Sequence, residues 1–234
     1  MKIDVLKNVF QKNENAAAEN RARLDELGIT CVNLLGGAGS GKTSILEAVV
    51  PKLCASVRVA VLEGDLATTK DADRIARLNV PVVQLLTGGG CHLNATLVQH
   101  ALNKLPTADL DLLIIENVGN PICPANFDLG EHLRISVLSV AEGDDKPAKY
   151  PLLFKDVDAV LITKCDLLAH VGFDFHQVWQ DIRRLNPKAE IIETSVSWGT
   201  GMRRLSDWLT CRSAPLVEAK DESQAGSRPV MSGE

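Results

Sequence analysis

The sequence predicts a three-layer α/β fold with a mostly parallel sheet and an N-terminal helical extension. Seven short apolar segments rich in β-branched residues recur along the chain, and most alternate with amphipathic helical segments. The 234 residues are 45% hydrophobic, enough for one substantial core and short for two. The string GGAGSGKTS lies directly between the first apolar segment and a helical one. Together these observations predict a P-loop nucleotide hydrolase.

The periodicity places each element in order. Residues 2–27 have helical periodicity that stops at Gly28, so we expect one or two helices in an extension over residues 1–28. The nucleotide-binding domain is expected at 29–211. We expect strands at 30–35, 58–62, 80–85, 111–115, 135–140, 159–162 and 190–194, and further helices at 42–54, 69–78, 92–105, 174–185 and 201–209. Residues 212–234 lose periodicity and apolar content, which predicts a disordered tail.

Charge and cysteine usage exclude several classes of function. A formal net charge of −5 gives no positive field that would attract nucleic acid or an anionic membrane. No run approaches the roughly 18 apolar residues that cross a bilayer, so we expect a cytoplasmic protein without membrane or nucleic-acid partners. The six cysteines lack the paired spacing of a disulfide framework. Cys31, Cys54 and Cys211 lie in apolar or helical segments and are expected to be buried.

The glycine-rich string fits GxxxxGK[ST], whose backbone N–H groups surround a polyphosphate. Lys42 is expected to reach the β and γ phosphate oxygens as a catalytic residue, and the Thr43 hydroxyl to bind Mg²⁺. The alternative is a glycine-rich turn without a ligand. The expected phosphate-binding residues are Gly36, Gly37, Ala38, Gly39, Ser40, Gly41, Lys42, Thr43 and Ser44.

A second motif predicts which nucleotide base is bound. Thr163, Lys164 and Asp166 follow a late strand, in the place of the guanine-binding [NT]KxD motif. The Asp166 carboxylate can accept hydrogen bonds from N1–H and the N2 amino group of guanine, neither of which adenine offers. The alternative role for Asp166 is a helix N-cap. The segment TSVSWGTGM, which begins at Thr194, is expected to lie beside the base.

Two acidic elements are expected to complete the magnesium site. Glu63, Gly64 and Asp65 end the second strand, and Glu116 to Gly119 form an ExxG version of the DxxG switch. We therefore expect Asp65 and Glu116 to bind Mg²⁺ with Thr43 and to take part in catalysis, Asp65 by orienting water. The Gly119 N–H is expected to turn toward the γ phosphate. Alternatively, both acids merely end strands and cap helices.

Three further residues could bind a transition metal. Cys91 and His92 stand together at a helix start, and Cys123 follows the ExxG switch. Two thiolates and an imidazole suit Ni²⁺ or Zn²⁺. Taken alone, however, a Cys-His pair and a distant cysteine favour ordinary buried or exposed thiols over a metal site.

The order of these motifs resembles the hydrogenase nickel-incorporation GTPases, the HypB family. The resemblance covers about residues 2–211 and is carried by LEGDLATTKDADRI, GCHLNA, IIENVGNPICPANFDLGE, LITKCDLL and TSVSWGTGM. It implies that Cys91, His92 and Cys123 bind nickel or zinc, and that GTP and GDP control the transfer of this metal. It also implies a GTP-dependent homodimer whose partners are a small zinc-containing accessory protein and the large subunit of apo-hydrogenase.

The chain departs from the family pattern in three places. It has no CxxCGC motif and no histidine-rich tract, so the resemblance implies no nickel storage. Thr96 stands where some relatives have a second histidine, which leaves the coordination number open, and the base motif is TKCD instead of NKxD. Three other functions stay open: a related GTPase for urease or cobalamin enzymes, a small-molecule kinase, and a non-catalytic metal-binding scaffold controlled by a nucleotide.

Overall fold

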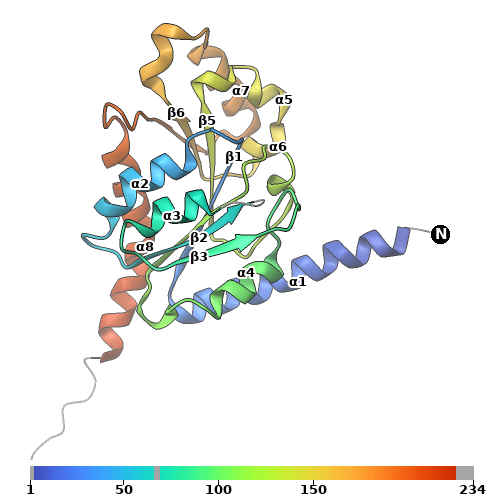
Figure 1. Ribbon diagram of the computed structural model, residues 1–234, viewed down its shortest axis with the longest axis vertical. Helices are drawn as coiled ribbons and strands as arrows, with labels where there is room; N and C mark the ends of the chain where they lie inside the picture. Colours follow the sequence, from blue (N-terminus) through green and yellow to red (C-terminus); the bar gives the residue numbers. More distant parts are fainter. Residues whose placement is uncertain (1–2, 66–68, 225–234) are drawn as a thin grey trace, which may run out of the picture.

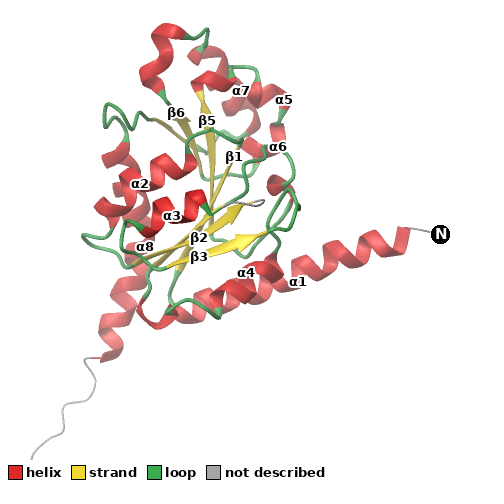
Figure 2. Cartoon of the chain, viewed as in Figure 1, coloured by secondary structure: helices red, strands yellow, loops and turns green. Residues whose placement is uncertain are grey.

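The computed structural model describes residues 3–65 and 69–224 of the chain. All seven predicted strands are present and form one sheet in the order β3-β2-β4-β1-β5-β6-β7, in which every neighbouring pair is parallel (Figures 1 and 2). The strands are β1 (Thr30–Gly36), β2 (Val59–Asp65), β3 (Val82–Leu86), β4 (Leu112–Glu116), β5 (Leu133–Ser139), β6 (Ala159–Thr163) and β7 (Glu190–Glu193).

The predicted helices are present, and short helices join them. The N-terminal extension is a single helix, which is one of the two possibilities that the periodicity left open. The longer helices are α1 (Ile3–Leu27), α2 (Lys42–Leu53), α3 (Lys70–Ala76), α4 (Ala95–Leu102), α7 (Phe175–Leu185) and α8 (Met202–Gln224). The shorter helices, which span too few residues to show periodicity in the sequence, are η1 (Thr107–Asp109), η2 (Pro124–Asn126), η3 (Val140–Glu142), α5 (Lys146–Lys149), α6 (Pro151–Lys155) and η4 (Cys165–His170).

Helices cover both faces of the sheet, as the three-layer prediction requires. Along β1 the buried side chains alternate between the two faces. Val32 and Leu34 belong to the apolar cluster formed with α2 and α8. Cys31 packs in the cluster that includes α1 and α4, and Leu35 in the one that includes α6 and α7. Burial on both faces explains why this strand is almost continuously apolar in the sequence.

Two sequence expectations need correction. α8 continues through Gln224, so the predicted disordered tail is helical as far as it is described, and residues 225–234 lie outside the described residues. Loss of hydrophobic periodicity removes the signal for packing, but Ala, Leu, Glu and Lys keep a high intrinsic helix propensity. Cys54, just after the end of α2, and Cys211, in α8, are exposed instead of buried, whereas Cys31 is buried as expected. Among the described helices, none combines the length and apolar character needed to cross a bilayer.

Parallel pairing brings the predicted motifs to one edge of the sheet. β1, β2, β4 and β6 all point their carboxyl ends to this edge, where ligands bind in open α/β sheets (Figure 1). Glu63 at the end of β2 pairs with Glu116 at the end of β4, and Thr163 at the end of β6 pairs with Ser139 of β5. The phosphate loop, both acidic elements and the TKCD motif therefore meet at one crevice.

Candidate nucleotide and metal site

The phosphate loop connects β1 to α2, as the sequence predicts. Lys42 is the first residue of α2, and its ammonium lies inside the loop, where Nζ donates to the carbonyl oxygens of Gly36 and Gly37 at 3.2 Å each. Burial lowers the pKa of Lys42, whereas the charge of Glu116 opposes this shift. The lysine is only 6% exposed, so its charge is held at the floor of the loop.

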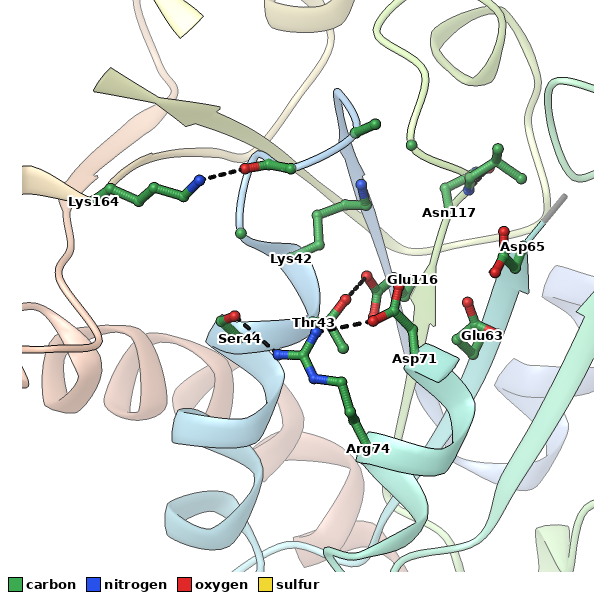
Figure 3. A pocket seen from close by; sticks show the side chains of 16 residues that line it. Lys42, Thr43, Ser44, Glu63, Asp65, Asp71, Arg74, Glu116, Asn117 and Lys164 are labelled. Carbon is green, nitrogen blue, oxygen red and sulfur yellow. Dashed lines mark hydrogen bonds and ion pairs between the residues drawn. The ribbon is translucent and has the colours of Figure 1, made fainter. Parts of the chain in front are cut away.

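Thr43 and Glu116 lie beside this lysine. The Thr43 hydroxyl donates to Oε1 of Glu116 at 2.7 Å (Figure 3). Oε2 of Glu116, Oε2 of Glu63 and Oγ of Ser40 are buried without a hydrogen-bond partner among the described residues. Because buried polar atoms are normally paired, these oxygens fit a hydrated cation and a phosphate. Hydroxyl and carboxylate oxygens are the ligands that Mg²⁺ prefers.

A cavity of about 360 Å³ opens above these residues, within the range of small-molecule sites. Asp65 and Gly119, both predicted site residues, line it with the phosphate loop. Figure 3 shows Glu63 and Asp65 on β2 facing the same space as Glu116. Asp71 and Arg74 of α3 close one side, where Arg74 donates to Asp71 and to the Ser44 hydroxyl. The cavity thus combines a buried ammonium with several carboxylates.

Glu63 and Glu116 have shifted pKa values, which predicts a pH dependence of stability. Burial raises the pKa of each from 4.5 to about 7, and the neighbouring Glu116 charge adds to the shift at Glu63. The pKa of each group is higher in the folded than in the unfolded chain. The contribution of these two carboxyl groups to the free energy of unfolding is therefore fully present below about pH 4.5 and is lost as the pH rises through about 7. We expect the melting temperature of the nucleotide-free, magnesium-free protein to fall over this window in differential scanning calorimetry.

Glu63→Gln should flatten this fall, because the amide does not ionise. Glu14→Gln, at an exposed position of α1, is the matched control and should keep the wild-type slope. If the melting temperature of folded Glu63→Gln fell with pH as steeply as that of the wild type, Glu63 would not be a cause of this pH dependence.

The TKCD motif lies against the phosphate loop. The Thr163 hydroxyl donates to the carbonyl oxygen of Ser40 at 2.5 Å, and Nζ of Lys164 donates to that of Gly39 at 2.6 Å. Lys164 has the left-handed φ of 58°, which is uncommon for a residue with a Cβ and typical of functional sites. Both side chains therefore connect the base motif directly to the phosphate loop.

Asp166 lies at a second cavity of about 260 Å³, which Gly41 and Lys164 also line, so the two cavities adjoin. Ser195 Oγ donates to Oδ1 of Asp166 at 2.6 Å, and this hydrogen bond lowers the pKa of the carboxyl group. Val196 and Ser197 of the predicted base-side segment line the same cavity. Asp166 is therefore an oriented, ionised acceptor.

The ExxG switch connects the nucleotide cavity to the metal residues. A Cβ at Gly119 would lie 2.8 Å from Cα of Ala38, so only glycine allows the switch to pack this closely on the phosphate loop. The next residue, Asn120, forms an isolated antiparallel bridge with Gly36, and its side-chain amide donates to the carbonyl oxygen of Cys91 at 3.2 Å. Asn120 thus touches both the phosphate loop and the metal segment.

Cys91, His92 and Cys123 come together as predicted. One ligand atom from each lies within 4.8 Å of the other two, and Sγ of Cys91 is 3.6 Å from Nδ1 of His92. Ligands of a tetrahedral Zn²⁺ ion stand roughly 3.7 Å apart, given metal–sulfur bonds of about 2.3 Å, so small side-chain shifts would close this set around an ion. His100 is an exposed residue of α4 and lies outside this group.

The surroundings of these three residues fit a metal site. Cys123 next to it raises the pKa of the Cys91 thiol, chiefly through a hydrogen bond, and a bound cation would instead stabilise both thiolates. The His92 ring stacks on Phe127, with ring centroids 3.8 Å apart and an interplanar angle of 19°. Burial lowers the pKa of His92, which favours the neutral imidazole that metals bind.

Two features of the site were missed by sequence reasoning. Glu63 was named only as a strand end, although an acid within an apolar strand signals a special environment. Asn117 of the switch donates to the Asn33 side chain at 3.2 Å, and Asn33 donates to Glu131 at 3.1 Å. These hydrogen bonds connect the switch through Asn33 of β1 to Glu131.

Comparisons with known proteins agree with this geometry. The family described as "CobW/HypB/UreG, nucleotide-binding domain" matches residues 30–193. The hydrogenase maturation factor HypB of Azotobacter vinelandii is 46% identical over 218 residues, which cover 93% of this chain and 72% of that protein.

Two solved structures are similar. HypB of Archaeoglobus fulgidus has a TM-score of 0.81 and 38% identity, over 87% of this chain and 99% of that one. HypB of Helicobacter pylori, solved in complex with nickel, has a TM-score of 0.82 and 37% identity, over 87% of this chain and 96% of that one.

Proposed function

The chain belongs to the CobW/HypB/UreG family of nucleotide-binding proteins, and from this premise we propose that it is a GTPase that delivers nickel during hydrogenase maturation. The HypB relatives are hydrogenase maturation factors, and one of them was solved with nickel. The proposal assigns GTP to the two adjoining cavities and nickel, as cargo, to Cys91, His92 and Cys123.

The proposed reaction is hydrolysis of GTP. A water oxygen bonds to the γ phosphorus while the bond to the β–γ bridging oxygen breaks, which yields GDP and inorganic phosphate. Lys42 and the loop amides stabilise the charge that develops on the phosphate oxygens. Mg²⁺, held by Thr43, Asp65 and Glu116, would supply further charge neutralisation. Asp65 lines the cavity and is our candidate for orienting the water.

Nickel transfer requires partners and a suitable compartment. We propose that GTP promotes a homodimer, and that the metal passes between a small zinc-containing accessory protein, this chain and the large subunit of apo-hydrogenase. Zn²⁺ competes for the same thiolates and imidazole. All six cysteines are free, which suits a reducing, GTP-containing compartment such as the cytoplasm.

One observation carries the proposal that the nucleotide controls the metal. Gly119 packs on the phosphate loop at Ala38, and Cys123 follows only four residues later. Asn120 between them bonds both Gly36 and the Cys91 carbonyl. A γ phosphate that attracts the Gly119 N–H must therefore displace Cys123 relative to Cys91 and His92, so two nucleotide states have two metal geometries.

We expect the nickel affinity to differ between the GDP and GTP-analogue forms by about 5- to 150-fold, the usual range of coupling between two sites. By linkage, nickel must change the ratio of the two nucleotide affinities by the same factor. Competition with a chromophoric chelator, at one pH and with the dimer fraction known, measures this difference. Metal affinity should also fall as pH drops, because protons compete for the thiolates.

Cys123→Ser should weaken nickel binding and erase the coupling while GTP still binds. Cys211→Ser, at an exposed cysteine of α8, is the control and should behave as wild type. Equal nickel affinities in every nucleotide state would refute control by the nucleotide. Single-turnover hydrolysis no faster than in buffer would instead favour the non-catalytic scaffold.

A further inference from the structure

Two asparagines of α1 are buried on the side that packs against the start of α4. Asn13 and Asn20 are 8% and 1% exposed. They stand seven residues apart, which is two helical turns, so they project from the same face of α1. Ala16 and Ala17 lie between them and form a small apolar cluster with Ala95 of α4. These small side chains let α1 approach the start of α4 closely (Figure 1).

Each asparagine joins the same two chain segments. Asn13 accepts from the Ala95 N–H at 2.9 Å and donates to the Asp128 carbonyl oxygen at 2.8 Å. Asn20 donates to the Ala95 carbonyl oxygen at 2.8 Å and to that of Leu129 at 3.0 Å. The N–H of Ala95 belongs to the first turn of α4 and has no intrahelical acceptor, so Asn13 supplies the one it needs.

Both segments continue directly from metal residues. Cys91 and His92 precede Ala95 by four and three residues, whereas Cys123 precedes Asp128 by five. Asp128 directly follows Phe127, whose ring stacks on His92. The two asparagines therefore hydrogen-bond to the two segments that carry the metal ligands, a few residues after the ligands themselves.

The contact with α1 restricts the backbone of residues 128–130, in the segment that follows Cys123. Gly130 has the left-handed φ of 91°, and a Cβ there would lie 2.6 Å from the Ala17 carbonyl oxygen and from Cβ of Asn20. Arg21 of α1 also donates to both carboxylate oxygens of Asp128, at 2.8 and 3.0 Å. α1 thus fixes residues 128–130 through backbone and side chain.

We propose that Asn13 and Asn20 are positioning residues of the metal site, and that α1 sets the distance between the Cys91–His92 segment and the Cys123 segment. They tune nickel affinity without touching the ion, as groups outside the ligand set do in metal sites generally. This inference rests on the proposed function, since it assigns nickel to the three ligands.

The experiment measures nickel affinity of the full chain by competition with a chromophoric chelator. Asn13→Ala and Asn20→Ala should each lower it by about 10-fold or more, the usual effect of losing a group that orients a ligand. GTP-analogue affinity should stay at the wild-type value. Asn15→Ala is the matched control, because Asn15 lies on the exposed side of the same helix.

An isosteric variant separates the two contacts of one side chain. Asn13→Asp keeps an acceptor for the Ala95 N–H but cannot donate to the Asp128 carbonyl. It should lower nickel affinity and shift the Ni²⁺–thiolate charge-transfer absorption, whereas Asn15→Asp should change neither. If Asn20→Ala does not fold, the two Asn13 variants decide the question.

The outcomes distinguish this inference from the proposed function. Folded Asn13 and Asn20 variants that melt at lower temperature but bind nickel with wild-type affinity and spectrum would overturn the positioning role and leave only a structural one. Wild-type protein that binds no nickel, or a Cys123→Ser variant that binds it unchanged, would instead overturn the metal site itself.

Discussion

Lys42→Ala should abolish GTP hydrolysis, with a fall in the single-turnover rate of at least about 10²-fold, while the chain remains folded. The ammonium of Lys42 lies inside the phosphate loop between the Gly36 and Gly37 carbonyl oxygens. It is the buried cation that faces the transferring phosphoryl group in our proposal. Alanine removes this charge and leaves the apolar core around α2 in place.

Two measurements make the Lys42 result decisive. Circular dichroism and the melting temperature establish that the variant is folded, and phosphate release under single-turnover conditions measures chemistry alone. Lys52→Ala is the matched control, because Lys52 lies on the same helix at an exposed position. Normal turnover in folded Lys42→Ala would show that the glycine-rich loop is not the catalytic phosphate site.

Local patterns explain why most of the fold could be predicted. A strand buried on both faces is almost continuously apolar, as β1 is, and a loop that fits GxxxxGK[ST] between a strand and a helix is typical of a phosphate-binding loop. The predicted strands and the grouping of Cys91, His92 and Cys123 are confirmed by the coordinates. The roles of these site residues in binding and catalysis stay predictions.

Contacts between distant residues explain what could not be predicted. Glu63 becomes a site residue only through the register that pairs β2 with β4 beside Glu116. Ser195 bonds Asp166 across 29 residues, and Asn13 bonds Ala95 across 82. No periodicity encodes such pairs. α5 and α6 were missed because helices of 4 and 5 residues do not complete an amphipathic repeat.

Asp166→Asn should exchange GTP for xanthosine triphosphate, because the new amide donates to the O2 of xanthine where guanine presents an amino group. In the wild type the carboxylate is ionised and oriented by the Ser195 hydroxyl at 2.6 Å. Sites that hydrogen-bond a ligand group discriminate against its absence by as much as about 10⁴-fold, so the preference should invert by a comparable factor.

Competition binding with fluorescent GDP measures both affinities in one assay. Ser195→Ala should weaken GTP binding without any gain for xanthosine triphosphate, since it removes the orienting hydrogen bond but keeps the carboxylate. Asp156→Asn, at an exposed position outside both cavities, should leave the preference unchanged. Because the cavity beside Asp166 adjoins the phosphate cavity at Gly41 and Lys164, a nucleotide bound there must present its base to residue 166. Unchanged GTP affinity in Asp166→Asn would therefore place the base elsewhere and leave Asp166 as an acidic residue in the first turn of η4, whose N-cap is Lys164.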